Sequence, residues 1–237
     1  GSTGALLTGA TLITKRIHGI RRAAMAPVIP TTTGQAVLID CGANAECTPE
    51  YLVQFAYLGS FYAQQVLGLE RPRVGLLNIG TEDSKGTDLQ KQTLARLKEA
   101  DAAGHLHFIG NIEAKEAIKG GCDVIVTDGF SGNILLKTME GVGSFAGSAL
   151  KSMFKKNLLT KLAALAVMPG LNAFKDKLDP NKVGGTAFIG ISKAVIKAHG
   201  ASNAEAVENA VGQAAAFARS GLIEKIEENV NLMKIEQ

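Results

Sequence analysis

Four clusters that pair glycine with small polar residues contain the side chains best suited to chemistry. Each follows a short apolar run, at residues 40–44 (DCGAN), 78–86 (NIGTEDSKG), 110–111 (GN) and 128–133 (DGFSGN). Such a turn exposes backbone N–H groups at a helix N-terminus, where the aligned peptide dipoles favour an anion such as phosphate. Taken singly, each cluster is better explained as a helix cap. Together, and with Lys85 among them, they indicate a polar cleft that accepts phosphate.

The opening residues Gly1-Ser2-Thr3-Gly4 have the same form. The hydroxyl of Ser2 or Thr3 would add a donor to the N–H groups of the turn. A turn of this kind follows a strand, so we expect the natural chain to begin earlier. Because turns at strand exits on one sheet edge lie close together, we expect phosphate where this turn meets the turn at 128–133.

His199 closes an apolar run at 195–199. At a strand exit its imidazole could orient a phosphate or a leaving group, although a capping or core histidine explains it equally well. His105 and His107 have no cysteine or carboxylate at metal-ligand spacing, so we expect them to be solvated and no metal to bind. The sequence also has no Gly-x-Ser-x-Gly elbow, no phosphate loop ending in Gly-Lys-Ser/Thr and no dinucleotide fingerprint.

Composition excludes several classes of protein. With 237 residues, of which 46% are hydrophobic, the chain is a folded protein and not a disordered tail. The 25 Lys and Arg against 22 Asp and Glu leave a net charge of only +3, which argues against a nucleic-acid partner. Three cysteines, an odd number, fit a reducing cytosol. No apolar run is long enough to span a membrane, and the first residues lack the basic-then-apolar profile of a signal peptide.

The clusters must be positioned by alternating strands and helices. Apolar periodicity predicts helices at 4–17, 49–67, 88–102, 132–153, 203–220 and 221–230. It predicts strands at 24–29, 36–39, 74–79, 106–109, 123–127 and 194–197, the first two forming a hairpin or a strand pair. This alternation predicts a doubly wound α/β/α layer fold. We find no linker or repeat, so residues 1–237 are expected to form one α/β domain.

Residues 154–178 interrupt this alternation and are expected to protrude as a helical segment. Leu158, Leu162, Leu165 and Met168 form an apolar stripe bordered by lysines, and Pro169-Gly170 is expected to end the helix before it could span a bilayer. The stripe is typical of a helix that lies on a membrane surface. A dimer helix or a core helix would bury the same leucines, and the sequence leaves these alternatives nearly level.

Five ordered motifs resemble those of the PlsX family of bacterial phosphate acyltransferases. They are residues 40–44, 74–82 with Lys85-Gly86, 108–113 (FIGNIE), 128–133 with Lys137, and 197–200 (KAHG). Their order and spacing argue against chance similarity, and the resemblance covers essentially the whole chain. Thr186-Ala187-Phe188 stands where the family has Ala-Pro-Leu-like residues, a conservative departure. The family has a further N-terminal α/β portion, which fits the abrupt start.

The resemblance implies transfer of a long-chain fatty acyl group from acyl carrier protein to inorganic phosphate, giving acyl phosphate for phospholipid synthesis. It implies a fold similar to those of isopropylmalate dehydrogenase and phosphotransacetylase. It also implies a cytoplasmic homodimer that needs no metal or organic cofactor and attaches peripherally to the membrane. The downstream glycerol-3-phosphate acyltransferase is a further candidate partner. The acidic carrier is expected to dock on basic residues near the cleft, either Lys15, Arg16, Arg21 and Arg22 or Lys151, Lys155 and Lys156, although ordinary solvated side chains explain both clusters equally well.

This reaction needs donors for an oxyanion and a cation or acid near the departing thiol. We therefore expect catalytic roles for Lys85, Lys137, His199 and Asn78. The expected phosphate-binding residues are Ser2, Thr3, Gly4, Asp40, Asn44, Gly80, Glu82, Asn111, Asp128, Gly129, Ser131, Gly132 and Asn133. Two rival functions are a short-chain phosphotransacetylase that uses coenzyme A, against which the apolar 154–168 segment argues, and a non-catalytic membrane-surface binding protein.

Overall fold

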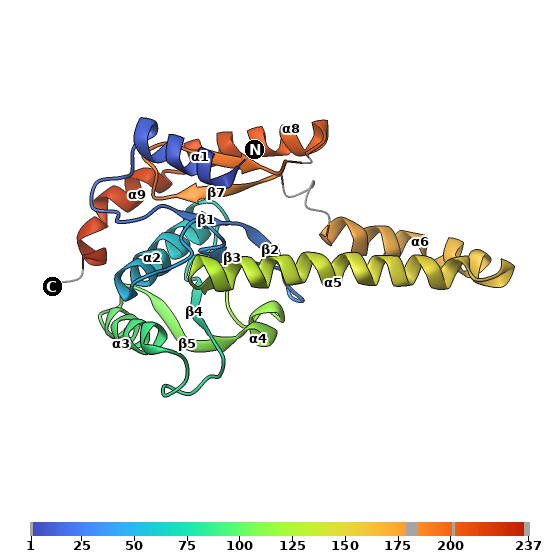
Figure 1. Ribbon diagram of the computed structural model, residues 1–237, viewed down its shortest axis with the longest axis horizontal. Coiled ribbons are helices and arrows are strands. Elements are labelled where there is room, and N and C mark those ends of the chain that lie inside the picture. Colours follow the sequence, from blue (N-terminus) through green and yellow to red (C-terminus); the bar gives the residue numbers. More distant parts are fainter. Residues whose placement is uncertain (1, 179–183, 201, 235–237) are drawn as a thin grey trace.

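The computed structural model describes residues 2–178, 184–200 and 202–234. The elements are α1 (Thr3–Gly9), the π-helical turn η1 (Ala10–Thr14), β1 (Ala24–Ala26), β2 (Val28–Pro30), β3 (Gln35–Ile39), α2 (Pro49–Gln65), β4 (Arg73–Asn78), α3 (Asp88–Ala102), β5 (His107–Glu113), α4 (Ala114–Ile118), β6 (Val124–Val126), α5 (Gly129–Lys155), α6 (Leu158–Leu178), β7 (Gly185–Ile189), β8 (Val195–Ala198), α8 (Ala204–Arg219), α9 (Leu222–Glu228) and the 3-10 turn η2 (Val230–Met233). Figure 1 shows their arrangement.

A five-stranded sheet forms the centre of the fold, in the order β2-β3-β6-β4-β5. The strands β3, β6, β4 and β5 run parallel, and β2 pairs with β3 as an antiparallel hairpin at one edge. Side chains alternate across this sheet: Val37 and Ile39 pack with α2, whereas Ala36 and Leu38 pack on the opposite face. Helices cover both faces, which confirms the predicted α/β layer class.

A second, three-stranded antiparallel sheet, β1-β7-β8, was not predicted. The run at 24–29 was predicted as one strand, but Pro27 divides it between the two sheets. Proline has no N–H to give to a ladder, so the chain can leave one sheet there, while the Pro27 carbonyl still accepts a hydrogen bond from the N–H of Leu38 at 3.0 Å. The two sheets are therefore joined through a single residue.

Several predicted boundaries were wrong. The helix predicted at 4–17 ends at Thr14, because Lys15 takes a positive φ of 70°. The helix predicted from residue 132 begins three residues earlier, since Asp128 caps it and Gly129 is its first residue. The strand predicted at 106–109 extends to Glu113, and α4 and β7 were not predicted.

The predicted helix break at Pro169-Gly170 was also wrong, because α6 continues through Pro169 to Leu178. A proline inside a helix costs about 3 kcal/mol through a lost hydrogen bond and a ring clash. Here α6 packs along α5, and this tertiary contact stabilises the helix despite the proline.

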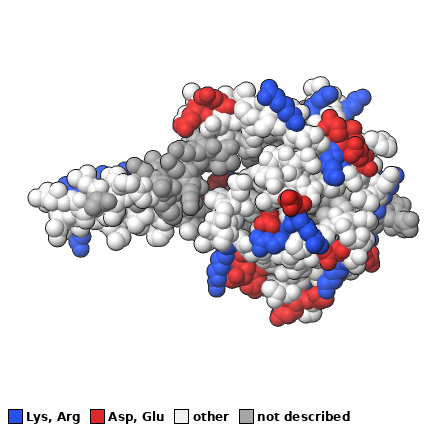
Figure 2. All heavy atoms as spheres, turned by 180° about the vertical axis from the view of Figure 1, so that it is seen from behind, with Lys and Arg blue, Asp and Glu red and all other residues white. Residues whose placement is uncertain are grey.

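Together, residues 141–155 of α5 and all of α6 form a projection that we call the arm (Figure 1). Among the described side chains of the arm, few on the face seen in Figure 2 are charged, while both signs of charge are spread over the rest of that face. At its far end Leu158 and Leu159 are 74% and 77% exposed. Within the part of the chain that the structure describes, no helix is long and apolar enough to cross a bilayer.

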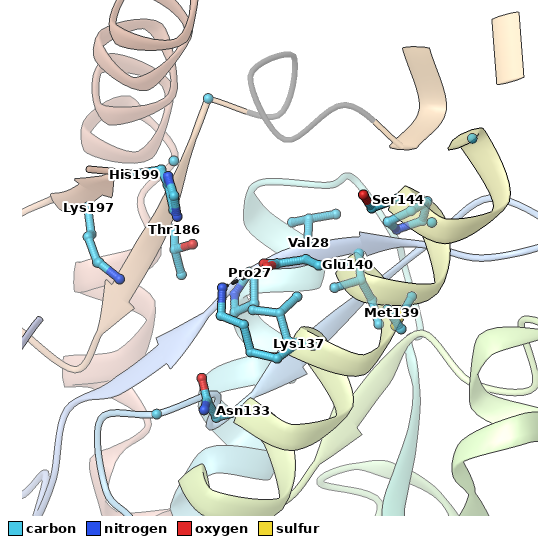
Figure 3. Close-up of a pocket in the computed structure, with 18 of the residues that line it drawn as sticks. Pro27, Val28, Asn133, Lys137, Met139, Glu140, Ser144, Thr186, Lys197 and His199 are labelled. Atoms are coloured by element: carbon cyan, nitrogen blue, oxygen red, sulfur yellow. Dashed lines mark hydrogen bonds and ion pairs between the residues drawn. The ribbon is translucent and has the colours of Figure 1, made fainter. Parts of the chain in front are cut away.

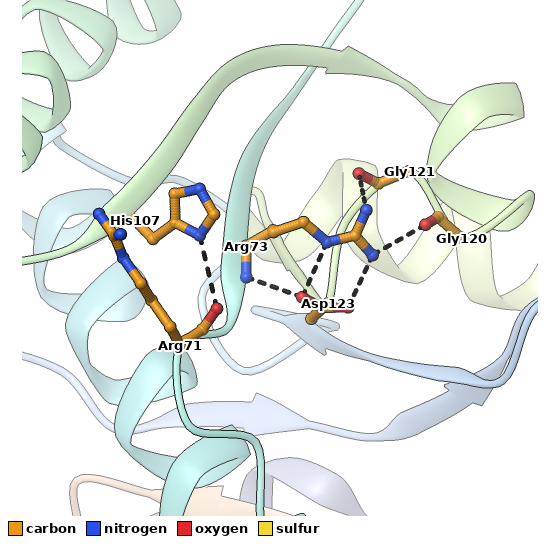
Figure 4. A network of polar contacts seen from close by, with 6 residues as sticks. All are labelled: Arg71, Arg73, His107, Gly120, Gly121 and Asp123. Atoms are coloured by element: carbon orange, nitrogen blue, oxygen red, sulfur yellow. Dashed lines mark hydrogen bonds and ion pairs between the residues drawn. The ribbon is translucent and has the colours of Figure 1, made fainter.

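The strand ends opposite the polar clusters are held by Arg73 (Figure 4). Its Nε and Nη2 donate to Asp123 at 3.0 and 2.8 Å, and its Nη1 and Nη2 donate to the carbonyls of Gly121 and Gly120 at 3.1 and 3.0 Å. Partial burial would raise the pKa of Asp123, but the hydrogen bonds from Arg73 outweigh it and hold that pKa below its ordinary value. This network ties the start of β4 to the turn that leads into β6.

Two helical glycines give opposite predictions for stability. A Cβ at Gly59 in α2 would lie 2.6 Å from Val124 Cγ1, whereas a Cβ at Gly212 in α8 would have no neighbour within 4 Å. Gly59→Ala should lower the free energy of unfolding by about 1–2 kcal/mol, because overpacking exceeds the gain in helix propensity. Gly212→Ala, the matched control, should raise it by about 0.5–1 kcal/mol. Urea unfolding followed by circular dichroism measures both, and equal changes would contradict the packing described for α2.

Candidate functional site

A cavity of about 1280 Å³ lies where the arm joins the two sheets. Its walls come from β1 and β2, the turn after β3, one face of α5, the inner side of α6, and β7 and β8 (Figure 3). This volume is somewhat above the range of about 300–1,000 Å³ for small-molecule sites. The cavity can therefore hold a substrate larger than phosphate.

The polar end of the cavity is predominantly cationic. Lys137 lies on α5, while Lys197 and His199 come from β8 and the residue after it, across the cavity (Figure 3). Lys137 Nζ contacts Glu140 Oε2 at 2.7 Å, and both side chains are about half exposed. With one carboxylate against two lysines, this end can attract and hold an anion.

Two of the predicted turns meet at this cavity. Thr3 from the opening turn lines it together with Gly129 and Asn133 from the turn after β6. Ser2 stands at the N-cap of α1, where its side chain makes no capping hydrogen bond. The phosphate site predicted between these turns therefore has a cavity to occupy, with the Asn133 side chain on its wall (Figure 3).

Asp40 has a structural role that the prediction of a phosphate ligand missed. The carboxylate is fully buried, and its Oδ1 accepts from the N–H groups of Met25, Cys41 and Ala43 at 2.8, 2.7 and 3.1 Å. Its Oδ2 accepts from the backbone N–H and the side-chain amide of Asn44 at 2.6 and 3.0 Å. Burial raises the pKa of Asp40, and these hydrogen bonds oppose the rise. Asp40 and Asn44 shape the turn and are better described as positioning residues.

The turn at 128–133 is mainly a helix cap. Asp128 accepts from the N–H and the hydroxyl of Ser131 at 2.8 and 2.9 Å, and the Gly129 N–H donates to the Asn44 carbonyl at 2.8 Å. A Cβ at Gly132 would lie 2.0 Å from the Asp40 carbonyl oxygen. The N–H groups of 129–132 were expected as phosphate donors. In the structure Gly129 and Ser131 use theirs in the contacts above, and the Gly132 N–H donates to the Asp128 carbonyl at 2.9 Å.

A second polar cluster lies at the ends of β4 and β5 and does not line the cavity. Asn78 Nδ2 donates to the Lys85 carbonyl at 3.2 Å, and Asn111 Nδ2 donates to the Glu82 carbonyl at 3.0 Å. Asn111 is buried, and its Oδ1 has no hydrogen-bond partner among the residues that the structure describes. Gly80 packs under Lys85, where a Cβ would lie 2.9 Å from Lys85 Cγ. The structure thus separates the predicted site residues into two groups.

Sequence reasoning missed the cavity residues Lys197, Glu140 and Thr186. A signal for Lys197 was present: residues two apart in a strand share a face, and Lys197 stands two residues before His199. Glu140 follows Lys137 by three residues on one helix, which is the spacing of a side-chain pair. Thr186 lies on β7, a strand that the pattern did not predict.

Comparisons with known proteins give a consistent result. A model of the family described as fatty acid synthesis protein matches residues 1–225. A phosphate acyltransferase from Alkaliphilus oremlandii is 48% identical over 231 residues, which are 98% of this chain and 68% of that protein. One from Bacillus licheniformis is 47% identical over 97% of this chain and 69% of its own length. A solved phosphotransacetylase from Streptococcus pyogenes shares the fold, with a TM-score of 0.62 at 19% identity over 92% of this chain and 60% of that one.

The cysteines should be unreactive in the folded protein. Burial raises the pKa of Cys41, Cys47 and Cys122 to about 12, so the thiolate is a trace species at neutral pH. We expect all three to react with a thiol reagent such as 5,5′-dithiobis(2-nitrobenzoate) at about pH 8 only after unfolding in urea. A thiol that reacts rapidly in the native protein would contradict this assignment and would identify a candidate nucleophile.

Proposed function

The chain belongs to the family of fatty acid synthesis proteins, and from this we propose that it is an acyltransferase that moves a long-chain fatty acyl group from the thioester of acyl carrier protein to inorganic phosphate. The observation that carries the proposal is the cavity, which has Lys137, Lys197 and His199 at one end and, along the arm, a wall of apolar residues bordered by Lys151, Lys155 and Lys161. Phosphate needs the first environment and a fatty chain needs the second. We propose that residues 1–237 belong to one catalytic domain, which includes the arm.

The reaction breaks one bond and forms another at the same carbon. A phosphate oxygen attacks the thioester carbonyl, the oxyanion intermediate collapses, and the carbon–sulfur bond breaks to give acyl phosphate and a thiolate that takes up a proton. Lys137 and Lys197 hold the phosphate and partly neutralise it. The Asn133 amide supplies a donor to the oxyanion, and His199 supplies the proton to the departing sulfur.

The cluster with Lys85 and Asn78 is the competing phosphate site. Both residues belong to the motifs on which the resemblance was based, yet they lie outside the cavity as the structure has it. Parallel strands β4 and β6 are neighbours, so this cluster and the start of α5 follow adjacent strands. The kinetics of the Lys137→Met and Lys85→Met variants decide whether Lys137 or Lys85 contacts phosphate.

We propose that the carrier protein docks beside the mouth of the cavity on the arm. Lys151, Lys155 and Lys161 line the cavity there, and they complement an acidic partner. In the alternative cluster, Arg21 is paired with Glu50 at 2.9 Å and Arg22 stacks on Tyr51 at 5.7 Å. These arginines already have partners, which favours the arm as the docking surface.

We also propose that the end of the arm rests on a membrane and that α5 joins two copies of the chain. Leu158, Leu159 and Leu162 are exposed on α6 with lysines nearby, as in helices that lie at a lipid interface. Val142 and Phe145 are 60% and 74% exposed on α5, which suits a dimer contact. Leu165 and Met168, expected to contact lipid, also line the cavity, so they have a second role available.

The activity is tested by incubating the protein with palmitoyl carrier protein and measuring free carrier thiol. We expect thiol release that depends on phosphate. Lys137→Met should lower kcat/KM for phosphate by about 10- to 100-fold, the value of one lost charge-assisted hydrogen bond or more. Lys91→Met, on the exposed side of α3, is the control and should change nothing.

Other outcomes of this assay have separate meanings. If Lys85→Met has the larger effect, the phosphate site is the cluster at β4 and β5. Release of thiol without phosphate, or none at all, would contradict the proposed reaction. A preference for acetyl coenzyme A would support the short-chain phosphotransacetylase instead.

Membrane contact is tested by placing Glu at positions 158, 159 and 162. The triple variant Leu158→Glu, Leu159→Glu, Leu162→Glu should lose flotation with anionic liposomes, because three carboxylates would have to enter the interface. Activity on the dissolved carrier substrate should be retained, since none of the three residues lines the cavity. Val207→Glu with Val211→Glu, on α8, is the control and should still float. Loss of flotation in both variants would contradict a specific contact between the arm and the membrane.

A further inference from the structure

The cavity extends beyond its polar end along the arm. On α5, the residues that line it recur at helical spacing, at Gly143, Gly147 and Leu150, and they face Ala164 and Leu165 of α6. These five residues form an apolar wall of a groove between the two helices, which Lys151, Lys155 and Lys161 also line toward the end of the arm. The outward leucines Leu158 and Leu162 do not line it, so it is distinct from the surface proposed to meet a membrane.

The length of this groove matches a long acyl chain. With a rise of about 1.5 Å per residue, Gly147 lies about 15 Å along α5 from Lys137, and Leu150 about 20 Å. One leaflet of a bilayer core, which is the length of one lipid acyl chain, is also about 15 Å. A chain whose carbonyl carbon lies beside Lys137 would therefore end close to Gly147.

Gly147 keeps this part of the groove open. A Cβ built at this residue would have no atom within 4 Å, so the space beside it is empty in the structure. Glycine in the interior of a helix is less stable than alanine by about 0.5–1 kcal/mol, so the helix itself does not favour it there. The empty space beside a helical glycine fits a role in admitting a ligand.

We propose that the groove between α5 and α6 binds the acyl chain of the substrate, with its methyl end toward the end of the arm, and that Gly147 sets the longest chain that is accepted. The inference rests on the proposed function, because it takes the acyl thioester as substrate. The occupant is an unbranched fatty chain with an anionic or thioester head. Gly143, Gly147 and Leu150 offer the chain an apolar wall, and Lys137, Lys197 and His199 lie at the end where the head group would be. Lys151, Lys155 and Lys161 line the outer part of the groove, beyond Gly147.

The test fills the groove with a side chain. Gly147→Phe should lower kcat/KM for palmitoyl and stearoyl carrier protein by about tenfold or more, while octanoyl carrier protein changes by less than about twofold. The matched control is Gly141→Phe, because Gly141 lies on the same helix, has equally open space and does not line the cavity. It should leave the whole chain-length profile unchanged.

A second measurement does not depend on catalysis. Palmitate should displace a fluorescent fatty acid, cis-parinaric acid, from the original protein and from Gly141→Phe, but about tenfold more weakly from Gly147→Phe. Equal losses for all chain lengths, or a profile that does not shift, would overturn the groove while leaving the acyltransferase in place. Palmitate binding that Gly147→Phe weakens, in a protein that never forms acyl phosphate, would support the groove and reject the proposed function.

Discussion

The buried carboxylate of Asp40 is the interaction on which the rest of the structure depends. It gathers N–H groups from the turn that follows β3 and from Met25 of β1, so it joins the central sheet to the smaller one. This turn also forms the surface against which α5 begins. The Gly129 N–H donates to the Asn44 carbonyl, and Gly132 lies close to the Asp40 carbonyl. A buried carboxylate requires such a set of donors, because an unpaired charge in this position would be strongly destabilising. One side chain thus sets the relation between both sheets and the helix that leads into the arm.

Much of the central sheet and its helices could be predicted, because their signals are local. The helix α3 was predicted with its observed bounds, and the apolar runs of β4 and β6 were placed within one or two residues. The smaller sheet could not be predicted in the same way. Its strands are short, and β1 pairs with β7 across most of the chain, as Ala24 does with Ile189, so no local pattern records that pair. The break expected at Pro169 failed for a related reason, since packing between helices outweighs a local preference.

The candidate site was only partly predictable, because turn residues look alike whether they serve the backbone or a ligand. Asp40 and Asp128 each stand one or two residues before a glycine, and both carboxylates accept hydrogen bonds from backbone N–H groups of the chain itself. Lys137 and His199 were predicted as site residues and do line one cavity. Lys137 lies on α5 and His199 directly follows β8, and no spacing in the sequence shows that they meet. Only the fold brings them to opposite walls.

The arm is also a lever. Because α5 is one uninterrupted helix of 27 residues, it is about 40 Å long, and a tilt of about 5° at its first turn would move its far end by about 3–4 Å. That first turn has almost no freedom to tilt, since its glycines lie against the backbone of the 40–44 turn with no room for a methyl group. The direction in which the arm points, and hence the place where its outer end can touch anything, is therefore decided at the opposite end of the helix, by contacts between backbone atoms beside the sheet.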